Sequence, residues 1–162
     1  MNIPDLPPDL SFPKLGTSPE DQEFAFEAKR AAIGPYIIQR WGWDDNFQRD
    51  VHDSRYREKP FYVVRRGEKR LGTLSFQVLA GHIQFGEFYL FPIFQREGTG
   101  AKILAHCLKL ADSLALSVRL EHLHWNPVRS LYKRHGFVDV GRSDIHCFME
   151  RPVAVKRPAS DG

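Results

Sequence analysis

The segment "FPIFQREGTGAKI", residues 91–103, carries the residue types that bind an anion through the backbone. Two glycines, Gly98 and Gly100, stand one residue apart just before an apolar pattern of helical period. The first turn of a helix has unpaired N–H groups and a partial positive charge, and glycines let the backbone close on a ligand. We therefore expect residues 95–101 to form a cradle for phosphate.

Two familiar phosphate-binding loops do not match this segment. A P-loop needs a glycine four residues ahead of Gly-Lys-Ser/Thr, and the run from Gly98 to Lys102 lacks it. The dinucleotide fingerprint needs a third glycine where Ile103 stands. Taken alone, the glycine pair is a weak signal, because a plain strand-to-helix turn would explain it equally well.

The apolar pattern predicts the elements that position this segment. Strands are expected at 10–15, 61–66, 70–80, 82–91, 117–124, 137–141 and 145–150. The helix after the glycines should bury one face, made of Ile103, Leu104, Cys107, Leu108, Ala111, Leu114 and Ala115. A later helix should open at Asn126-Pro127 and end at Gly136, where a left-handed residue is favourable.

Two helical regions are expected before the first long strand. Ser18 is the predicted cap of the first, which Gly34-Pro35 should interrupt. The second should span 36–56, with Asp44 or Asp45 as a cap. The full order of elements predicts an α+β fold with a mixed, mostly antiparallel sheet and helices on both faces. We expect one domain over 10–151, with flexible tails at 1–9 and 152–162.

The composition is that of a globular domain, with 42% hydrophobic and 27% charged residues in a chain of 162. The formal charge of +3 is too balanced to argue for a nucleic-acid partner. No apolar run approaches the length of a membrane span and the first ten residues are no signal peptide, so we expect a cytoplasmic protein without a membrane partner. Cys107 and Cys147 lie far apart, outside any metal-type spacing, and no metal is expected.

A second motif, "NPVRSLYKRHGF" at 126–137, stands about thirty residues after "QREGTG". The two motifs together, in this order and on these elements, resemble the GNAT superfamily of N-acetyltransferases. In that superfamily the pyrophosphate loop reads Gln/Arg-x-x-Gly-x-Gly/Ala, and the last helix reads Asn-x-x-x-x-x-Tyr-x-x-x-Gly-Phe. The run "GPYIIQRWGWDDNFQ" is similar to one bacterial branch with a Trp-Gly-Trp-Asp segment, so that the resemblance covers roughly residues 10–150.

The resemblance implies acetyl-CoA as the donor and a primary amine as the acceptor. In such folds the fourth and fifth strands run parallel and splay apart, and here those strands would be 82–91 and 117–124. The pantetheine arm would enter the splay, and the pyrophosphate would rest on the glycine cradle. The implied coenzyme A contacts are Leu90, Phe91, Gln95, Arg96, Glu97, Gly98, Thr99, Gly100, Ala101, Lys102 and Asn126.

One position departs from the family pattern. Members often carry Gly-Lys or Arg-Gly where this chain has Arg96-Glu97. A carboxylate next to a phosphate site would weaken binding unless its side chain points away. We expect Glu97 to face solvent, with Arg96 and Lys102 offsetting its charge.

Acetyl transfer from a thioester needs a neutral amine, a hydrogen-bond donor to the carbonyl oxygen and a proton for the departing thiolate. Tyr132 stands at the position of the family's general acid, six residues after Asn126. A buried core aromatic is the alternative role for Tyr132, since one face of its helix must be buried. The resemblance implies a backbone N–H near Phe91 as the oxyanion donor.

The general base is open between several residues. Glu121 lies five residues before Asn126, where one ribosomal-protein acetyltransferase branch carries its catalytic glutamate; a solvated residue paired with Arg119 is an equally good interpretation. Glu87 could act through a water molecule. The pair His122 and His124 would face the same way on a strand, although a structural role is favoured for each.

The acceptor site is expected to involve Trp41, Trp43, Asp44 and Tyr89. An acidic and aromatic wall would suit a cationic amine. Core packing for the tryptophans and a helix cap for the aspartate are the plainer interpretations.

Three functions compete. The first is an N-acetyltransferase acting on a small-molecule or peptide amine, and the second is a non-catalytic acyl-CoA sensor of the same fold. A nucleic-acid partner bound through Lys133-Arg134 and Lys156-Arg157 ranks last, because a charge run is usually a solvated face. The acceptor's identity, a homodimer and the use of other acyl groups are left open.

Overall fold

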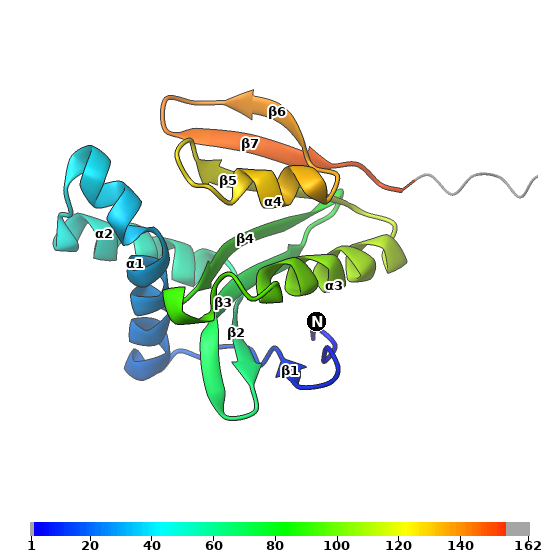
Figure 1. The fold of residues 1–162 in the computed structure, drawn as a ribbon, viewed down its shortest axis with the longest axis horizontal. Coiled ribbons are helices and arrows are strands. Elements are labelled where there is room, and N and C mark those ends of the chain that lie inside the picture. The colour runs from blue at the N-terminus through cyan, green and yellow to red at the C-terminus, as the bar shows by residue number, and fades with distance from the viewer. Residues whose placement is uncertain (1, 155–162) are drawn as a thin grey trace, which may run out of the picture.

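The computed structural model of the protein describes residues 2–154. Its helices are α1 (Pro19–Trp41), α2 (Asp45–Glu58), α3 (Thr99–Ser113) and α4 (Arg129–Arg134), with a short 3-10 helix η1 (Pro92–Phe94). Its strands are β1 (Leu10–Ser11), β2 (Phe61–Arg66), β3 (Lys69–Val78), β4 (His82–Leu90), β5 (Ser117–Leu123), β6 (Val138–Arg142) and β7 (His146–Arg151). The strands form one sheet in the order β1-β2-β3-β4-β5-β7-β6 (Figure 1).

The sheet confirms the predicted α+β fold and its parallel splay. Every neighbouring pair of strands is antiparallel except β4 and β5. These two run parallel and pair only over 82–84 and 117–119, at their N-terminal ends. Beyond that point β4 and β5 have no pairing with each other, so the sheet opens between them.

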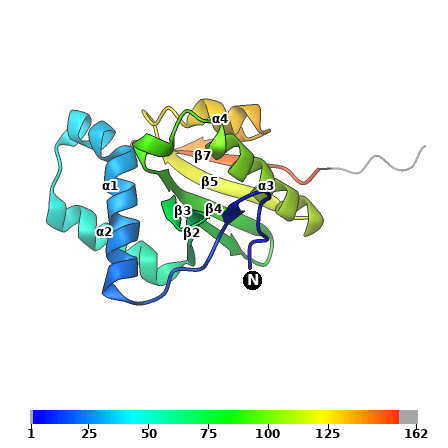
Figure 2. The same ribbon diagram turned by 60° about the horizontal axis from the view of Figure 1, so that its bottom comes forward.

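Helices cover both faces of the sheet. Side chains along β2 show this, because they point alternately to the two faces and are buried on each. Tyr62 and Val64 belong to the larger hydrophobic cluster, to which α3 contributes its apolar face. Phe61 and Val63 point the other way and pack in a smaller cluster with Ala25 of α1. Figure 2 accordingly shows α1 and α2 lying together, apart from α3 and α4.

Helix α1 corrects the prediction that Gly34-Pro35 interrupts it. The helix continues to Trp41 with Pro35 in its interior. A proline there removes one backbone hydrogen bond at a cost of about 3 kcal/mol. Pro35 is exposed, whereas Ile33 and Ile37 on the opposite side are buried at 7% and 4%. Burying these two side chains offsets the cost, at about 1.5–3 kcal/mol each.

The break between α1 and α2 comes at Gly42 instead, where φ is 74°. A residue with a side chain is strained at such an angle, and glycine is not. Asp44 then caps α2, because its Oδ1 accepts a hydrogen bond of 3.1 Å from the N–H of Phe47. Of the two predicted caps, Asp44 is confirmed.

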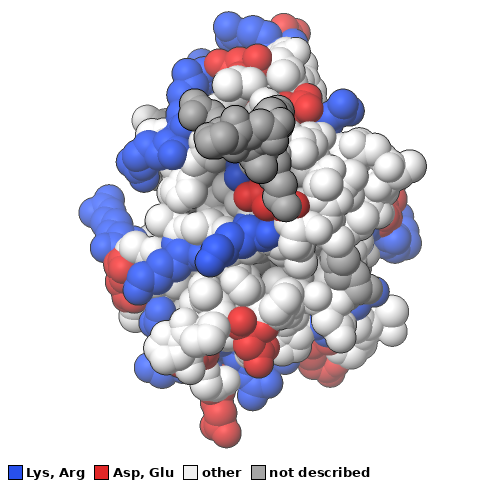
Figure 3. Space-filling model, turned by 90° about the vertical axis from the view of Figure 1, so that its right-hand side faces the viewer, with Lys and Arg blue, Asp and Glu red and all other residues white. Residues whose placement is uncertain are grey.

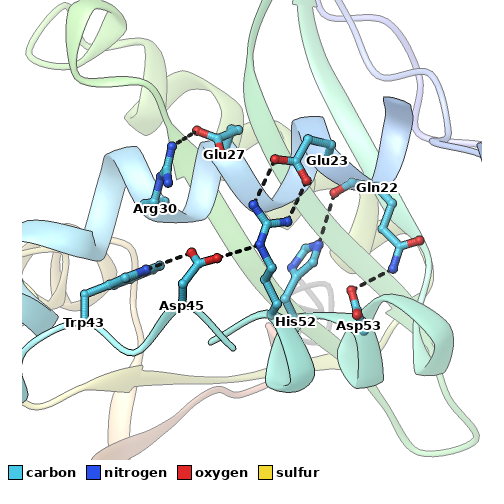
Figure 4. A network of polar contacts seen from close by, with 9 residues as sticks. Gln22, Glu23, Glu27, Arg30, Trp43, Asp45, His52 and Asp53 are labelled. Atoms are coloured by element: carbon cyan, nitrogen blue, oxygen red, sulfur yellow. Dashed lines mark hydrogen bonds and ion pairs between the residues drawn. The ribbon is translucent and has the colours of Figure 1, made fainter. Parts of the chain in front are cut away.

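A polar network holds α2 against α1 (Figure 4). The guanidinium of Arg49 donates to Glu23 on α1 at 2.7 Å and to Asp45 at 2.9 Å. His52, 1% exposed, lies within 3.3 Å of the carbonyl oxygen of Gln22. The network fixes the wall that α1 and α2 form beside the splay.

The chain ends differ from the expected flexible tails in part. Ile3 is 4% exposed within the larger hydrophobic cluster, and Leu6 exchanges backbone hydrogen bonds with Leu10. Of the expected C-terminal tail, residues 155–162 lie outside the described part. Within residues 2–154 no helix has the length and apolarity to cross a membrane, and no cluster of side chains could hold a metal ion.

Candidate active site

A cavity of about 470 Å³ occupies the opening between β4 and β5. Helices α1 and α2 form one wall, and the turn before α4, α4 itself and the start of β7 complete the lining. From Phe85 onward, the edge of β4 that faces this space has no partner strand on the β5 side. The arrangement can receive an extended ligand that hydrogen-bonds to β4 as a strand would.

A β-bulge in β4 shapes the cavity floor. Thr73 pairs with Tyr89 and Ser75 with Gly86, so that β4 has two residues, Glu87 and Phe88, opposite a single residue of β3. Glu87 has a φ of 47°, an unfavourable angle for a residue with a side chain, and the hydroxyl of Thr73 donates to its carbonyl oxygen at 2.9 Å.

The backbones of β3 and β4 also lie unusually close together next to the bulge. A Cβ atom at Gly72 would lie 1.9 Å from the carbonyl oxygen of Tyr89, so only glycine allows the two backbones to meet here. As a result of the bulge, both Glu87 and Tyr89 line the cavity.

Tyr132 lies at the cavity with its ring buried and its hydroxyl without a partner. The ring stacks on His122 at 6.1 Å and meets Phe137 edge-on at 5.5 Å. The residue is 5% exposed and lines the cavity, and its hydroxyl makes no hydrogen bond to any residue of 2–154. Burial raises the pKa of Tyr132, so the hydroxyl stays protonated and is available as a donor.

The turn before α4 differs from the predicted start at Asn126. Helix α4 begins at Arg129, and the side-chain oxygen of Asn126 accepts from the N–H of Val128 at 3.1 Å. Asn126 thus stabilises a turn that precedes the helix, and it lines the cavity. Gly136, with φ of 91°, follows the helix as predicted.

The two candidate carboxylates stand on the two strands of the splay. Glu121 on β5 has a side chain 40% exposed, and Arg55 of α2 lies 3.9 Å away. Glu87 on β4 is buried, 3.0 Å from the Nζ of Lys59 and 3.6 Å from Arg55. Burial alone would raise the pKa of Glu87, but the charges of Lys59, Arg55 and Lys29 outweigh it and lower that pKa.

The two candidate histidines have different surroundings. His122 lines the cavity, its Nδ1–H donates to the carbonyl oxygen of Leu123 at 2.8 Å, and its pKa is lowered chiefly by burial. His124 follows the last residue of β5 and is not in the lining of this cavity. Its Nε2 lies 2.6 Å from the carbonyl oxygen of Ser143 and its Nδ1 3.1 Å from the sulfur of Cys147.

The loop predicted to bind phosphate leads into the N-terminus of α3. Gly98 has φ of 78° and precedes the first helical residue, and Arg96 before it has φ of 65°. The first backbone hydrogen bond of the helix runs from the N–H of Lys102 to Gly98 at 3.2 Å. The N–H groups of the residues between, Thr99, Gly100 and Ala101, are the ones a helix start leaves for a ligand.

Side chains fix the cradle to the sheet. The amide of Gln95 donates to the carbonyl oxygen of Leu90 at 2.8 Å, which ties the loop to the end of β4, while the N–H of Phe91 donates to Leu71 at 2.9 Å. Arg66 of β2 donates to the hydroxyl of Thr99 at 3.1 Å.

The charge of Glu97 has a different partner from the expected one. Arg66 lies 3.6 Å from its carboxylate, whereas neither Arg96 nor Lys102 pairs with it. No motif in the sequence indicated Arg66, because its position follows from the packing of β2 beside the start of α3.

The expected acceptor residues divide into two groups. Trp41, Asp44 and Tyr89 line the cavity, and Trp41 meets Trp125 edge-on at 4.6 Å. Trp43 is not in the lining, since its ring packs on Phe26 at 6.1 Å and its N–H donates to Asp45 at 3.1 Å.

The wall formed by α1 and α2 is more basic than expected. Lys29, Arg55 and Lys59 all line the cavity, and sequence reasoning singled out none of them. A signal did exist for the first of them. Ala25, Lys29, Ile33 and Ile37 recur every four residues, and this spacing places a lysine on the buried face of α1.

Comparison with known families bears on this geometry. The profile of the acetyltransferase (GNAT) domain family matches residues 57–139 of the 162. The chain belongs to the GNAT acetyltransferase family. The matched part of this GNAT domain contains the cradle, the bulge, Glu121 and Tyr132. It contains neither α1 nor most of α2, so the family match does not cover the wall of the cavity that these two helices form.

Solved structures share the fold of this GNAT domain at low sequence identity. The protein PH1933 of Pyrococcus horikoshii is 19% identical with a TM-score of 0.71, covering 91% of this chain and 100% of its own. A PaiA N-acetyltransferase of Thermoplasma acidophilum, solved with coenzyme A, is 17% identical with a TM-score of 0.67, covering 88% and 99%. The ribosomal-protein-S18-alanine N-acetyltransferase of Escherichia coli is 16% identical with a TM-score of 0.65, covering 91% and 96%. A search of curated proteins finds no match.

Proposed function

We propose that the protein is an acetyl-CoA-dependent N-acetyltransferase that acetylates a primary amine of a small molecule or peptide. Membership of the GNAT family supports acetyl transfer in general. One structural neighbour is a coenzyme A complex by its own description, which supports acetyl-CoA as the donor. The primary amine and direct transfer are our proposal.

Three features of the chain would suit the pyrophosphate, the pantetheine arm and the acetyl group of acetyl-CoA. The helix start at Gly98 offers N–H groups in a backbone conformation that suits glycine, and these would bind the pyrophosphate. The backbone of β4 from Phe85 onward, which has no partner on the β5 side, would hydrogen-bond to the pantetheine arm. The acetyl group would then lie in the cavity beside Tyr132, and bound acetyl-CoA would supply an activated thioester carbonyl.

The side chains around the cavity suit the proton transfers. We assign Tyr132 as the general acid, because its hydroxyl is protonated, unpartnered among the described residues and faces the cavity. We assign Glu121 as the general base, because its carboxylate is partly exposed and only loosely paired with Arg55. Glu87 is the weaker candidate, because the surrounding cations lower its pKa and hold it ionised.

The observation that carries the proposal is the hydroxyl of Tyr132, which has no hydrogen-bond partner among the described residues, at a cavity where β4 and β5 no longer pair with each other. A structural tyrosine buried to 5% would normally bond its hydroxyl to the protein. This feature also favours an enzyme over a non-catalytic acyl-CoA sensor, which would need no proton donor at this place.

Release of free thiol from acetyl-CoA, measured with a panel of amines, tests the function. Amine-dependent release that disappears when acetyl-CoA or the protein is left out would support the enzyme. Tight binding of acetyl-CoA without release for any amine would support the sensor. If the protein neither bound acetyl-CoA nor released thiol from it, both hypotheses would be refuted.

We further propose that nucleic acid is not a partner of the protein. Lys and Arg side chains are interspersed with Asp and Glu over the face shown in Figure 3, which is not the basic stripe typical of nucleic-acid binding. A cytoplasmic location without a membrane partner is proposed on the sequence grounds given above.

A further inference from the structure

The wall of the cavity formed by α1 and α2 has an excess of positive charge. Lys29, Arg55 and Lys59 share the lining with two carboxylates, Glu87 and Glu121, and only Arg55 and Lys59 form ion pairs with them. With all five ionised, one positive charge is left without a partner. The remaining acidic residue of the lining, Asp44, is engaged elsewhere as the cap of α2.

Lys29 is the unbalanced residue. It is 3% exposed and lines the cavity, yet it makes no hydrogen bond or ion pair to any residue of 2–154. Its charge acts on Glu87 only at a distance, because the Oε1 of Glu87 is paired with Lys59 at 3.0 Å and the buried Oε2 has no hydrogen-bond partner in the described part of the chain. Burying an unpaired ammonium group is costly, so its retention at a cavity indicates a ligand.

Arg55 has donors to spare as well. Its guanidinium lies 3.6 Å from Glu87 and 3.9 Å from Glu121, beyond hydrogen-bond distance of both. The side chain therefore stands between the two diverging strands with N–H groups that face the cavity. A planar guanidinium in this position matches a carboxylate, which it can bind with two parallel hydrogen bonds.

We propose that the amine acceptor carries a carboxylate close to its amino group, as an amino acid does, and that Arg55 and Lys29 bind this carboxylate. The inference rests on the proposed N-acetyltransferase function and names its substrate class. The amino group of such an acceptor would lie toward Glu121, and the carboxylate toward α1 and α2. A single surplus positive charge matches one carboxylate, and a polyamine would bring further positive charge to a wall that already has an excess.

Matched acceptors test the proposal. We would measure kcat/KM by thiol release for a panel of amino acids, their amides and the corresponding amines without a carboxyl group. Loss of one charge-assisted pair predicts a preference for the acid of roughly tenfold to a thousandfold. The amides have the less basic amino groups and so more free amine at neutral pH, which biases the comparison against the expected result.

Two variants connect the preference to the residues. Lys29→Met and Arg55→Gln should each lower the ratio of kcat/KM for the acids to kcat/KM for the amines by about tenfold or more. Lys29→Met removes an unpaired buried charge and should fold even where Arg55→Gln does not. Arg119→Gln is the matched control, because this half-exposed arginine of β5 pairs with Glu150 at 3.6 Å outside the cavity.

The outcomes separate the two proposals. The inference would be supported if wild type preferred the acids over the amines and Lys29→Met did not. Amines acetylated equally well with and without a carboxylate would overturn it and leave the N-acetyltransferase function intact. Turnover of no amine in the panel would overturn both.

Discussion

Glu87 and Glu121 are chemically alike, but their surroundings give them different capacities to accept a proton. The charges of Lys59 and Arg55 lower the pKa of the buried Glu87, despite its burial, whereas Glu121 is 40% exposed and 3.9 Å from its nearest cation. A carboxylate held ionised by two cations is a weak base, and its natural role is to orient those cations. The assignment of Glu121 as base follows from this difference.

Substitution of each glutamate by glutamine should therefore have different effects on the pH–rate profile. Glu121→Gln keeps the shape of the side chain but cannot accept a proton, so kcat/KM at pH 7 should fall by roughly a hundredfold. Part of the loss should be recovered at higher pH, where more of the acceptor is free amine. A wild-type profile for Glu121→Gln beside a depressed acidic limb for Glu87→Gln would transfer the role to Glu87.

Tyr132→Phe should lower turnover by roughly tenfold to a thousandfold, the usual range for losing one proton donor. The ring keeps its stacking on His122 and its contact with Phe137, so the fold should be retained. Binding of coenzyme A, followed by its effect on the melting temperature, should stay near wild type. Unchanged kcat in this variant would remove Tyr132 from the mechanism.

Lys29 should make the stability of the protein depend on pH in the alkaline range. Burial lowers its pKa from 10.5 to about 8, despite the opposing charge of Glu87. Between these two values the unfolded chain binds more protons than the folded one, so stability should rise as pH increases. Between pH 7.5 and pH 9.5, urea unfolding should show a gain in stability of about 2 kcal/mol for wild type relative to Lys29→Met.

Lys109→Met is the matched control for that measurement, because Lys109 is exposed on α3. It should keep the pH dependence of wild type. An identical pH dependence in all three proteins would mean that the Lys29 ammonium is solvated in the folded state, and would weaken its assignment to the acceptor's carboxylate.

At the scale of elements, the cradle is built by one backbone conformation. Gly98 has φ of 78°, and a Cβ there would meet no neighbour within 4 Å, so space is not the constraint. The constraint is the angle itself, since a residue with a side chain loses about 1–2 kcal/mol in the left-handed region, and a β-branched residue loses more. A larger residue should therefore turn the N–H groups of the loop away from the ligand.

Gly98→Val should abolish the rise in melting temperature that acetyl-CoA causes in wild type. Gly67→Val is the control, because Gly67 has φ of 57°, equally open space and a place in the β2–β3 turn. Both variants should lose similar intrinsic stability, and only the control should keep the ligand shift. A full shift in folded Gly98→Val would show that the cradle lies elsewhere.

Elements with a local signal were predictable from the sequence, and elements set by packing were not. The stripe from Ile103 to Ala111 predicted α3, and the glycine pair placed its start. The continuation of α1 through Pro35 depends on burial against the sheet, which no local pattern records. The start of α4 at Arg129 follows from a turn that the side chain of Asn126 stabilises in place of a helix cap.

The same division holds for the candidate site. The cradle and Tyr132 stand in contiguous motifs and could be placed by spacing. Arg55 and Lys59 of α2 meet β4 and β5 only through the tertiary fold, so their convergence on Glu87 and Glu121 could not be predicted. For Trp43 the sequence predicted too much. It was expected at the acceptor site, but its side chain packs on Phe26 and does not line the cavity.

At the scale of the whole molecule, the sheet consists of two parts that meet along a short seam. The antiparallel strands β1 to β4 form one part, and β5 to β7 form the other. Only the pairs from His82 with Ser117 to Gln84 with Arg119 join them as a parallel ladder. The candidate site opens where this ladder ends, so binding in the cavity should brace one part of the sheet against the other.

Hydrogen exchange with and without acetyl-CoA tests this mechanical role. From Phe85 onward, those amides of β4 that point to the β5 side have no partner strand and should exchange readily, whereas the amides of residues 82–84 that bond to β5 should already be protected. Bound acetyl-CoA should slow early exchange at the open end of β4 and at the start of α3 by roughly tenfold or more, because both would gain hydrogen bonds to the ligand. The same experiment on Gly98→Val supplies the control, since a variant that folds without the cradle should show neither change. Uniform slowing along all strands would indicate general stabilisation by a ligand bound outside the splay, and would contradict the placement of the pantetheine arm between β4 and β5.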